Sequence, residues 1–495
     1  MKKTWRRALL SAAALALAFG LCACADTPSN GADDGTDPGG TPPSVLDEAA
    51  LTETKANPET EDPEDLAENE TWKNFVTITC GETIEVENSD ESDMSVSVSG
   101  TNITVTSSKK MVLTLRGTLN GSVLVTKPDG KLKLVLDGVT IRSQSGPAIN
   151  LQTEKRVFVE VADGTANSLT DGAEHPTMPD GSKTKAALFS EEQMIFSGNG
   201  TLNVTGNHSH AIASDDYLRF WSGTYVLGAV DDGLRANDAI IVDGGSIEAE
   251  AGSDGMECER GYVVFNGGKA ELNATDCGIK TSTAETYDPY IDVLNGMIGI
   301  TAGDDGLKSQ SDIRVRGGCI QAEAANNGIK AAGTISVSDG YVFAKSSGND
   351  AFDADGGIAV SGGTAVALAS SSDGAAFNAN AAGFSVTGGM IAAGANTETT
   401  PADSSAQCSL LYDNTNRNAL FRIENENGEE VLTMRYDATY GKLLFSVPGL
   451  VSGESYSLRA GGTADGAAFH GLGKGGTYSG SGEPERFTAQ AVTRI

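Results

Sequence analysis

Residues 231–258, DDGLRANDAIIVDGGSIEAEAGSDGMEC, carry the pattern that decides the fold. An Asp-Gly pair precedes a short apolar segment, two further alternating segments follow around a Gly-Gly corner, and Asp-Gly then returns. This punctuation recurs at Gly233, Gly255, Gly278, Gly306, Gly328, Ala351 and Gly374. The steps are 22 or 23 residues, except for one of 28 that contains an insertion at Ser282–Asp288. A fixed period of this length predicts a solenoid in which each repeat forms one coil.

Three apolar ladders run through the repeats at fixed offsets. The first contains Leu234, Met256, Ile279, Leu307, Ile329 and Phe352. The second contains Ile240, Val263, Ile291, Ile313, Ile335, Ile358 and Phe384, and the third Ile247, Ala270, Ile298, Ile320 and Val342. Every member of the last two has an apolar partner two residues later, on the same face of a strand. Three inward faces per coil predict an all-β, right-handed parallel β-helix with three sides and about 22 residues per coil.

The N-terminal sequence predicts export and lipidation. Four basic residues precede the apolar stretch Ala8–Leu21, which is too short to span a bilayer comfortably and is typical of a signal peptide over residues 1–23. Leu21-Cys22-Ala23-Cys24 resembles the lipobox of bacterial lipoproteins, with Cys24 as the modified residue. Ordinary cleavage without a lipid is the alternative. We therefore expect an exported protein that is lipid-anchored to the outer face of the bacterial cell membrane.

Composition divides the rest of the chain. Residues 24–71 are acidic and rich in Pro, Gly and Thr, which predicts a flexible tether. Residues 72–397 form the expected β-helix. The period fails after Gly394, and residues 398–495 are expected to form a small C-terminal β domain or a cap. Five scattered cysteines, an odd number, indicate small buried residues and no disulfide framework: Cys80, Cys258, Cys277, Cys319 and Cys408.

The formal net charge of -32 argues against nucleic acid as a partner. Carboxylates in this excess favour hard divalent cations such as calcium, although solubility alone also explains them.

Several motifs together resemble the bacterial carbohydrate-binding β-helix family. They are Asp231–Ala236, Gly303–Lys308, Leu134–Ile141, Asp163–Asp171 and Gly475–Gly480. The resemblance covers most of Met111–Phe487 and implies a right-handed β-helix, similar in architecture to pectate lyases, that binds calcium and plant polysaccharides such as cellulose and polygalacturonate. The sequence departs from the family pattern at residues 326–328, 349–351 and 372–374, which lack a second carboxylate.

The corner before the first ladder supplies candidate calcium ligands, because unpaired carboxylates on neighbouring coils repel each other and a cation with six to eight oxygen ligands relieves that repulsion. The candidates are Asp231, Asp232, Asp254, Asp276, Asp304 and Asp305. The alternative is that each aspartate is a turn residue whose side chain bonds to its own backbone.

Two outward columns are candidate carbohydrate contacts. The basic column consists of Arg235, Lys280, Lys308 and Lys330, interrupted by Glu257, and simple ion pairs with the aspartates are its alternative role. The aromatic column consists of Tyr217, Tyr262 and Tyr290, whose rings are suited to stacking on sugars or, alternatively, to supporting a loop. Tyr341 and Phe343 occupy another corner.

These residues favour a monomeric, surface-anchored, non-catalytic protein that binds polysaccharide, either plant cell-wall or acidic glycans, with bound calcium. No catalytic residue is assigned, because the four histidines lie in no nucleophile motif. One competing hypothesis is a calcium-dependent pectate-type lyase in which Arg235, Lys280 or Lys308 acts as base. Another is a structural adhesin or spacer. The membrane is expected as a partner through the lipid anchor only.

Overall fold

The computed structural model describes residues 47–495 except 89–93, 127–129, 179–180, 182, 283–288, 381–382, 403, 415–418 and 481. The expected signal peptide, the expected lipidation residue Cys24, residues 24–46 of the expected tether and most of the 282–288 insertion lie outside the described residues. The described residues belong to one compact unit, Gly39–Ile495. In these ranges no helix has the length and apolar character needed to cross a membrane.

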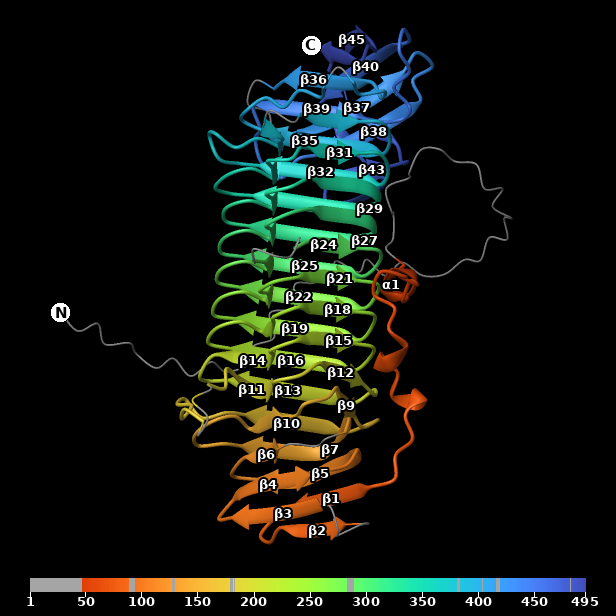
Figure 1. Ribbon diagram of the computed structural model, residues 1–495. Coiled ribbons are helices and arrows are strands. Elements are labelled where there is room, and N and C mark those ends of the chain that lie inside the picture. Colours follow the sequence, from red (N-terminus) through yellow and green to blue (C-terminus); the bar gives the residue numbers. More distant parts are fainter. Residues whose placement is uncertain are drawn as a thin grey trace, which may run out of the picture. The chain divides into compact units, whose positions relative to one another are not determined.

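One face of the coils is a 13-stranded sheet (Figure 1). Its strands are parallel and in register from β4 onward, whereas β3 and β4 form an antiparallel pair at the N-terminal end. In order the strands are β3 (Met94–Ser99), β4 (Asn102–Ser107), β6 (Val123–Thr126), β8 (Ile149–Gln152), β11 (Ala186–Ser190), β14 (His210–Ser214), β17 (Leu234–Ala236), β20 (Met256–Cys258), β23 (Ile279–Thr281), β26 (Leu307–Ser309), β28 (Ile329–Ala331), β30 (Phe352–Ala354) and β33 (Phe377–Asn378).

The other two faces share a 25-stranded sheet, because long strands cross the corner between them. The crossing strands β5 (Met111–Leu119), β7 (Leu132–Arg142), β27 (Ile313–Ala324) and β29 (Ile335–Ser346) belong to both faces, and β1 (Phe75–Cys80) and β2 (Glu85–Asn88) begin the sheet. The first face also contains β9 (Val157–Val161), β12 (Met194–Ser197), β15 (Tyr217–Phe220), β18 (Ala239–Val242), β21 (Tyr262–Phe265), β24 (Ile291–Val293), β31 (Ile358–Val360) and β34 (Phe384–Val386). The second contains β10 (Ala166–Thr170), β13 (Thr201–Gly206), β16 (Thr224–Ala229), β19 (Ser246–Ala251), β22 (Lys269–Ala274), β25 (Met297–Ala302), β32 (Thr364–Ala369) and β35 (Met390–Ala395).

The three predicted apolar ladders line the interior, which confirms the parallel β-helix. Leu234 pairs with Met256 and Met256 with Ile279, so like side chains form a continuous buried column. The periodicity is less clear upstream, because Ile195 is apolar but does not belong to the inward ladder. It pairs with the outward Arg219, and its neighbours Met194 and Phe196 fill the core.

The corner glycines are required by close packing between coils. Gly245 has φ 78°, and an added Cβ would lie 2.7 Å from the carbonyl oxygen of Gly223 on the preceding coil. A side chain there would be strained by the backbone conformation and would push neighbouring coils apart. The Gly-Gly corner therefore fixes the coil spacing.

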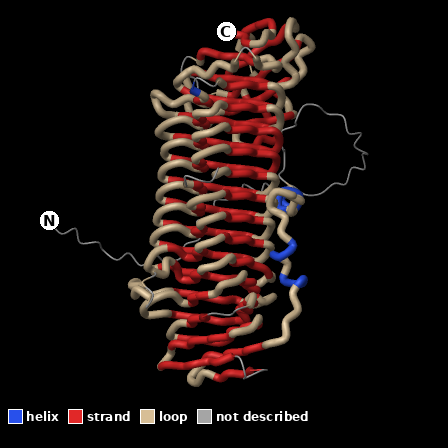
Figure 2. The backbone as a smooth tube through the Cα atoms, in the orientation of Figure 1, coloured by secondary structure: helices blue, strands red, loops and turns tan. Residues whose placement is uncertain are grey.

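Residues 47–71, here called the strap, lie along the outer side of the coils (Figure 2). The strap contains the short helices α1 (Glu48–Thr52), η1 (Pro63–Asp65) and η2 (Ala67–Asn69). Backbone hydrogen bonds join it to the sheet, from Lys55 N to Asn266 O at 2.7 Å and from Gly296 N to Leu51 O at 2.7 Å. This differs from the expected flexible tether. The strap has few large apolar residues, so apolar burial does little to order it. Polar contacts with the coils hold it instead.

A buried ionic network fastens the middle of the strap. Arg219 on β15 donates from Nε to Asp243 Oδ2 at 2.7 Å and from Nη1 to Asp65 Oδ2 at 3.0 Å. The same Nη1 donates to Thr60 O at 2.7 Å. Arg219, Asp65 and Asp243 are each no more than 3 % exposed. Arg219 therefore bridges two buried carboxylates, one from the strap and one from the coils, and Arg156 supplies Asp65 with a second positive charge at 3.3 Å.

The C-terminal segment continues the 25-stranded sheet and covers its outer side. β39 (Lys442–Ser446) pairs antiparallel with both β35 and β36 (Ser409–Asp413), and β46 (Val492–Arg494) follows β36. A six-stranded sheet contains β37 (Leu420–Asn425), β38 (Glu430–Arg435), β40 (Ser455–Ala460), β42 (Ala467–Phe469), β43 (Leu472–Lys474) and β45 (Glu485–Thr488), and β41 (Thr463–Ala464) pairs with β44 (Tyr478–Ser479). Tyr341 and Phe343 lie in the core that this segment shares with the coils.

The five cysteines considered above are free and buried, as their spacing predicts.

We expect Arg219→Met to lower the free energy of unfolding by about 3–5 kcal/mol, because it leaves the Asp243 carboxylate buried without a counter-charge and leaves Asp65 with Arg156 alone, at 3.3 Å. Urea denaturation measures the loss, and faster hydrogen exchange in residues 55–66 reports release of the strap. Lys55→Ala is the control, because Lys55 forms an exposed pair with Glu53 at 2.9 Å and its removal should cost less than about 1 kcal/mol. Equal effects of the two substitutions would show that the network does not hold the strap.

Candidate functional site

The predicted basic column is present on the outer side of the 13-stranded sheet. Arg235, Glu257, Lys280, Lys308 and Lys330 occupy the central position of consecutive strands β17 to β28 and are in register. Asp353 and Asn378 extend the column on β30 and β33. All four basic side chains are half-buried, because each leans against acidic neighbours.

The inner aspartates form a ladder of hydrogen bonds between coils. Asp232 Oδ1 accepts from Asp254 N at 3.0 Å, Asp254 Oδ1 accepts from Cys277 N at 2.8 Å, and Asp305 Oδ1 accepts from Asn327 N at 3.0 Å. Asn327 and Asp350 continue the ladder toward the C-terminus. Each side chain thus satisfies a buried backbone N–H of the next coil. These aspartates are turn residues whose side chains bond to backbone, which was the alternative to calcium binding. The hydrogen bond, however, joins each side chain to the neighbouring coil and not to its own turn.

The basic column neutralises this ladder. Lys280 Nζ lies 2.9 Å from Asp254 Oδ2, and Lys308 Nζ lies 2.9 Å from Asp305 Oδ2 and 3.0 Å from Asp304 Oδ2. Arg235 bonds to Asp232 at 3.2 Å and contacts Glu257. Three of the four predicted cations are therefore already paired with predicted metal ligands, and Lys330 pairs with Asp353 at 3.2 Å.

The three outer aspartates remain accessible. The side chains of Asp231, Asp276 and Asp304 are 45 %, 46 % and 33 % exposed. Asp304 Oδ1 also accepts from the Asn326 amide at 3.0 Å. These carboxylates form the solvent-facing edge of the site.

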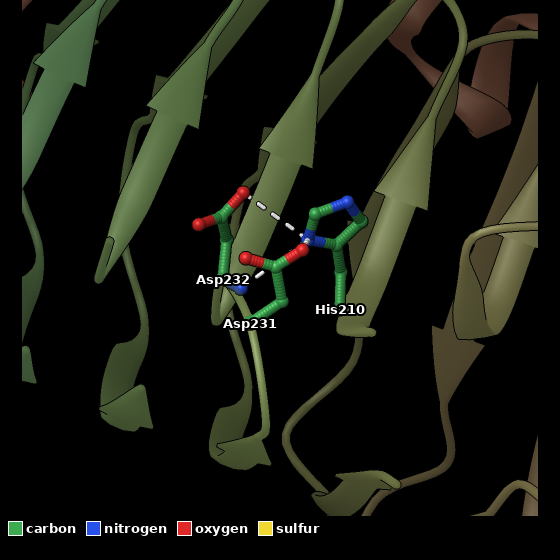
Figure 3. A group of neighbouring side chains, drawn as sticks. All are labelled: His210, Asp231 and Asp232. Carbon is green, nitrogen blue, oxygen red and sulfur yellow. Dashed lines mark hydrogen bonds and ion pairs between the residues drawn. The ribbon is translucent and has the colours of Figure 1, made fainter. Parts of the chain in front are cut away.

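His210, on β14, joins the site although no sequence motif indicated it (Figure 3). Its Nδ1 lies 3.1 Å from Asp232 Oδ2 and 3.7 Å from Asp231 Oδ2, and it accepts from Asp232 N at 3.2 Å. His210 stands 22 residues before Asp232, so it occupies the ladder position of the preceding coil. Extending the period by one coil would have found it.

Among the residues that the structure describes, four groups of side chains bring possible ligand atoms within 4.8 Å of one another: His210 with Asp231 and Asp232, Asp254 with Asp276 and Cys277, Cys277 with Asp304 and Asp305, and Asp232 with Asp254 and Glu257. The all-carboxylate group does not fit a calcium ion, since Arg235 and Lys280 already contact its three members. Burial raises the pKa of the Cys277 thiol well above its usual range, which makes it a poor ligand. The exposed carboxylates of Asp231, Asp276 and Asp304 have the chemistry that a hydrated calcium ion prefers.

The aromatic column is aligned but does not form a flat platform. The rings of Tyr262 and Tyr290 stack on each other at 5.0 Å between centroids, so their edges and not their faces point outward. Arg314 lies over the Tyr290 ring at 4.3 Å, and burial raises the pKa of Tyr290 to about 12. The Tyr217 hydroxyl donates to Asp65 of the strap at 2.5 Å. The column therefore supports the strap, and it belongs to the 25-stranded sheet, not to the basic column's face.

The fold and this face define a parallel β-helix protein with a column of paired charges on successive coils. Residues 99–374 match the model of the family described as carbohydrate-binding domain-containing protein, and the chain belongs to this family. A protein of the same description from Acetivibrio thermocellus is 27 % identical over 234 residues, which cover 46 % of this chain and 79 % of the relative. A solved structure described as the polysaccharide lyase-like protein from C. thermocellum, in a gadolinium derivative, is 25 % identical, with a TM-score of 0.38 over 48 % of this chain and 98 % of that one.

The ladder predicts a specific pH dependence of stability. Burial raises the pKa of Asp254 to about 6, above the value of about 3.9 expected in the unfolded chain. The native state therefore retains this proton where the unfolded chain has lost it, so stability is greatest below pH 4 and falls as the pH rises toward 6. We expect this part of the decline, up to about 3 kcal/mol, to be absent in Asp254→Asn.

The measurement compares urea unfolding of the two proteins from pH 4 to pH 7. Asp339→Asn is the control, because Asp339 is exposed and lies outside the ladder. Parallel pH profiles for the original chain and Asp254→Asn would contradict the prediction.

Proposed function

We propose that this chain binds polysaccharide along the outer face of the 13-stranded sheet and that it is held at the cell surface through Cys24. The observation that carries the binding proposal is the family match, because residues 99–374 include every coil that contributes to the basic column. The N-terminal sequence supports the anchor.

The repeating geometry of the column suits a polymer. Adjacent strands lie about 4.8 Å apart, so a polysaccharide parallel to the β-helix axis would meet a charged side chain on each coil from Arg235 to Asp353. Lys280 and Lys308 are positioned by their carboxylate partners, which reduces the side-chain entropy lost on binding. Sugar hydroxyls donate and accept hydrogen bonds, and the column offers both carboxylate acceptors and ammonium donors.

Binding of an acidic glycan to this face requires additional positive charge. The carboxylates around the column outnumber its cations, so a uronate would be repelled unless a cation bridged the two surfaces. We propose that hydrated calcium ions fill this role separately at the exposed carboxylates of Asp231, Asp276 and Asp304, and that an ion bound at Asp304 displaces Lys308 from it. When bound, calcium would supply positive charge and open coordination positions for a uronate carboxylate.

The charges favour binding over lyase chemistry. The carboxylates beside Lys280 and Lys308 raise the pKa of both ammonium groups, although burial opposes the shift. Both lysines therefore stay protonated at neutral pH and are poor general bases. Unsaturated, ultraviolet-absorbing ends released from polygalacturonate would identify a lyase and overturn the binding-only proposal.

Replacing Lys280 and Lys308 together with alanine should weaken polysaccharide binding at least tenfold, because two neighbouring donors are lost on adjacent coils. Affinity electrophoresis on immobilised polysaccharides measures the change. Lys133→Ala is the matched control, because Lys133 is similarly half-buried and pairs with Glu160 on the 25-stranded sheet. Unchanged mobility of the double variant, or an equal loss in the control, would remove the column from the binding site.

Chelation should abolish binding of polygalacturonate while leaving neutral polysaccharide bound, because a bridging cation is needed only between like charges. Asp276→Asn combined with Asp304→Asn should weaken the calcium-dependent binding and leave the folded state intact, since both side chains are solvent-facing. The readout is polygalacturonate binding with and without EDTA. Binding that persists in EDTA contradicts the calcium proposal without affecting the neutral-glycan proposal.

A further inference from the structure

The aromatic column continues toward the N-terminal end of the β-helix as a line of cations. Lys110, Lys131 and Arg156 each stand directly before the first residue of β5, β7 and β9, and these strands pair in register. Tyr217 has the same offset two coils further on. Because adjacent coils lie about 4.8 Å apart, the three cations follow the β-helix axis over about 10 Å. Such a line suits a polymer that carries a carboxylate at regular intervals.

The strap already presents carboxylates to this line. Residues 59–70 contain seven acidic side chains and no basic one. The Glu70 carboxylate bridges two coils, with Oε2 2.6 Å from Lys110 Nζ and Oε1 2.6 Å from Lys131 Nζ. Hydrogen bonds from these two lysines lower the pKa of Glu70. Glu64 adds a second contact, 3.2 Å from Lys131 Nζ. The strap therefore occupies the line as an acidic polymer would.

Arg156 is held by the strap at the third coil. Its Nη2 lies 2.9 Å from Asp62 Oδ2, and its Nη1 lies 3.5 Å from Glu64 Oε2. The side chains of Asp62 and Glu64 are 40 % and 69 % exposed, whereas Asp65, which contacts Arg156 and Arg219, is buried. Carboxylates from solution therefore have access to the first two pairs, and the buried pair with Arg219 anchors the strap.

The end of the strap is held to the coils by side chains. In residues 66–71, the backbone N–H groups of Asn69 and Glu70 donate to Leu66 and Ala67 of the strap itself, at 3.0 Å and 3.2 Å. Ion pairs at a protein surface contribute little stability and are weakened by salt, so another carboxylate can replace one. This part of the strap can therefore separate from the coils while the Asp65 anchor stays in place.

We propose that the line of Lys110, Lys131 and Arg156 is a second binding surface for an acidic polysaccharide, which needs no calcium, and that the strap closes it as an internal competitor. The three cations lie within the matched residues 99–374 and the strap lies outside them, which favours a glycan over an acidic polypeptide. The apparent affinity of the original chain is reduced by the fraction of molecules in which the strap is open. This surface is separate from the basic column and does not rest on the function proposed for it.

The test measures polygalacturonate binding by the full chain in EDTA, which removes the calcium-bridged binding proposed for the basic column. Glu64→Gln combined with Glu70→Gln takes away the carboxylates that neutralise Lys110 and Lys131. We expect this double variant to bind at least tenfold more tightly than the original chain in affinity electrophoresis. Faster hydrogen exchange in residues 66–71 should show that the strap has opened. Adding Lys110→Ala and Lys131→Ala should abolish the gain.

Glu61→Gln combined with Glu68→Gln is the matched control. Both glutamates are exposed, belong to the same part of the strap and remove the same formal charge, so this variant should bind like the original chain. Polyglutamate of similar length tests an acidic polypeptide as the ligand. Cooperative urea unfolding of each variant verifies that its coils are folded.

Three outcomes overturn the proposal. The first is a double variant that binds polygalacturonate no more tightly than the matched control. The second is a gain in affinity that survives the loss of both lysines, and the third is tighter binding of polyglutamate alone.

Discussion

Register between coils is the constraint on which the rest of this structure depends. Every position of one coil lies beside the equivalent position of the next, because parallel strands pair residue for residue. Side chains that follow one another along a column must therefore be compatible with their neighbours in polarity and charge. Inside, this produces the continuous apolar ladders of Leu234 and its equivalents. At the corner it gives the side-chain ladder through Asp232 and Asp254, and outside it gives the basic column.

The same constraint explains how the charged face is stable. Carboxylates stacked on neighbouring coils would repel, and the ladder resolves this by giving Asp232, Asp254 and Asp305 each a backbone N–H and a cationic side chain. Lys280 and Lys308 are spaced like the acids they neutralise, because both columns follow the coil period. The charge balance is thus local even though the whole chain carries -32.

Periodicity made the β-helix predictable from the sequence, since the ladders, the punctuation at Gly233 and Gly255 and the in-register column of Arg235 and Lys280 all follow from one repeat length.

Features outside the period were not predictable in this way. The strap contacts its coils through single polar groups such as Asp65, which no local pattern distinguishes from a solvated acid. His210 keeps the period, but it carries an imidazole where the following coils carry an aspartate, so a search for repeated aspartates passes over it. The Tyr262 and Tyr290 rings stack on each other in a manner that alignment alone cannot reveal. The sequence is equally consistent with aspartates that bind a metal and with aspartates that pair with the basic column. Only the distances between the side chains distinguish the two roles.

The strap also has a mechanical consequence. It meets the coils at Gly296 and Asn266, passes Arg219, and only then enters β1 at the N-terminal end of the sheet. Tension applied to the chain ahead of residue 47 therefore acts first on several hydrogen bonds and the buried ion pair, and it does not peel β1 from its neighbour directly. The strap distributes the load across the middle coils, so the free edge of the β-helix is shielded from force arriving along its own chain.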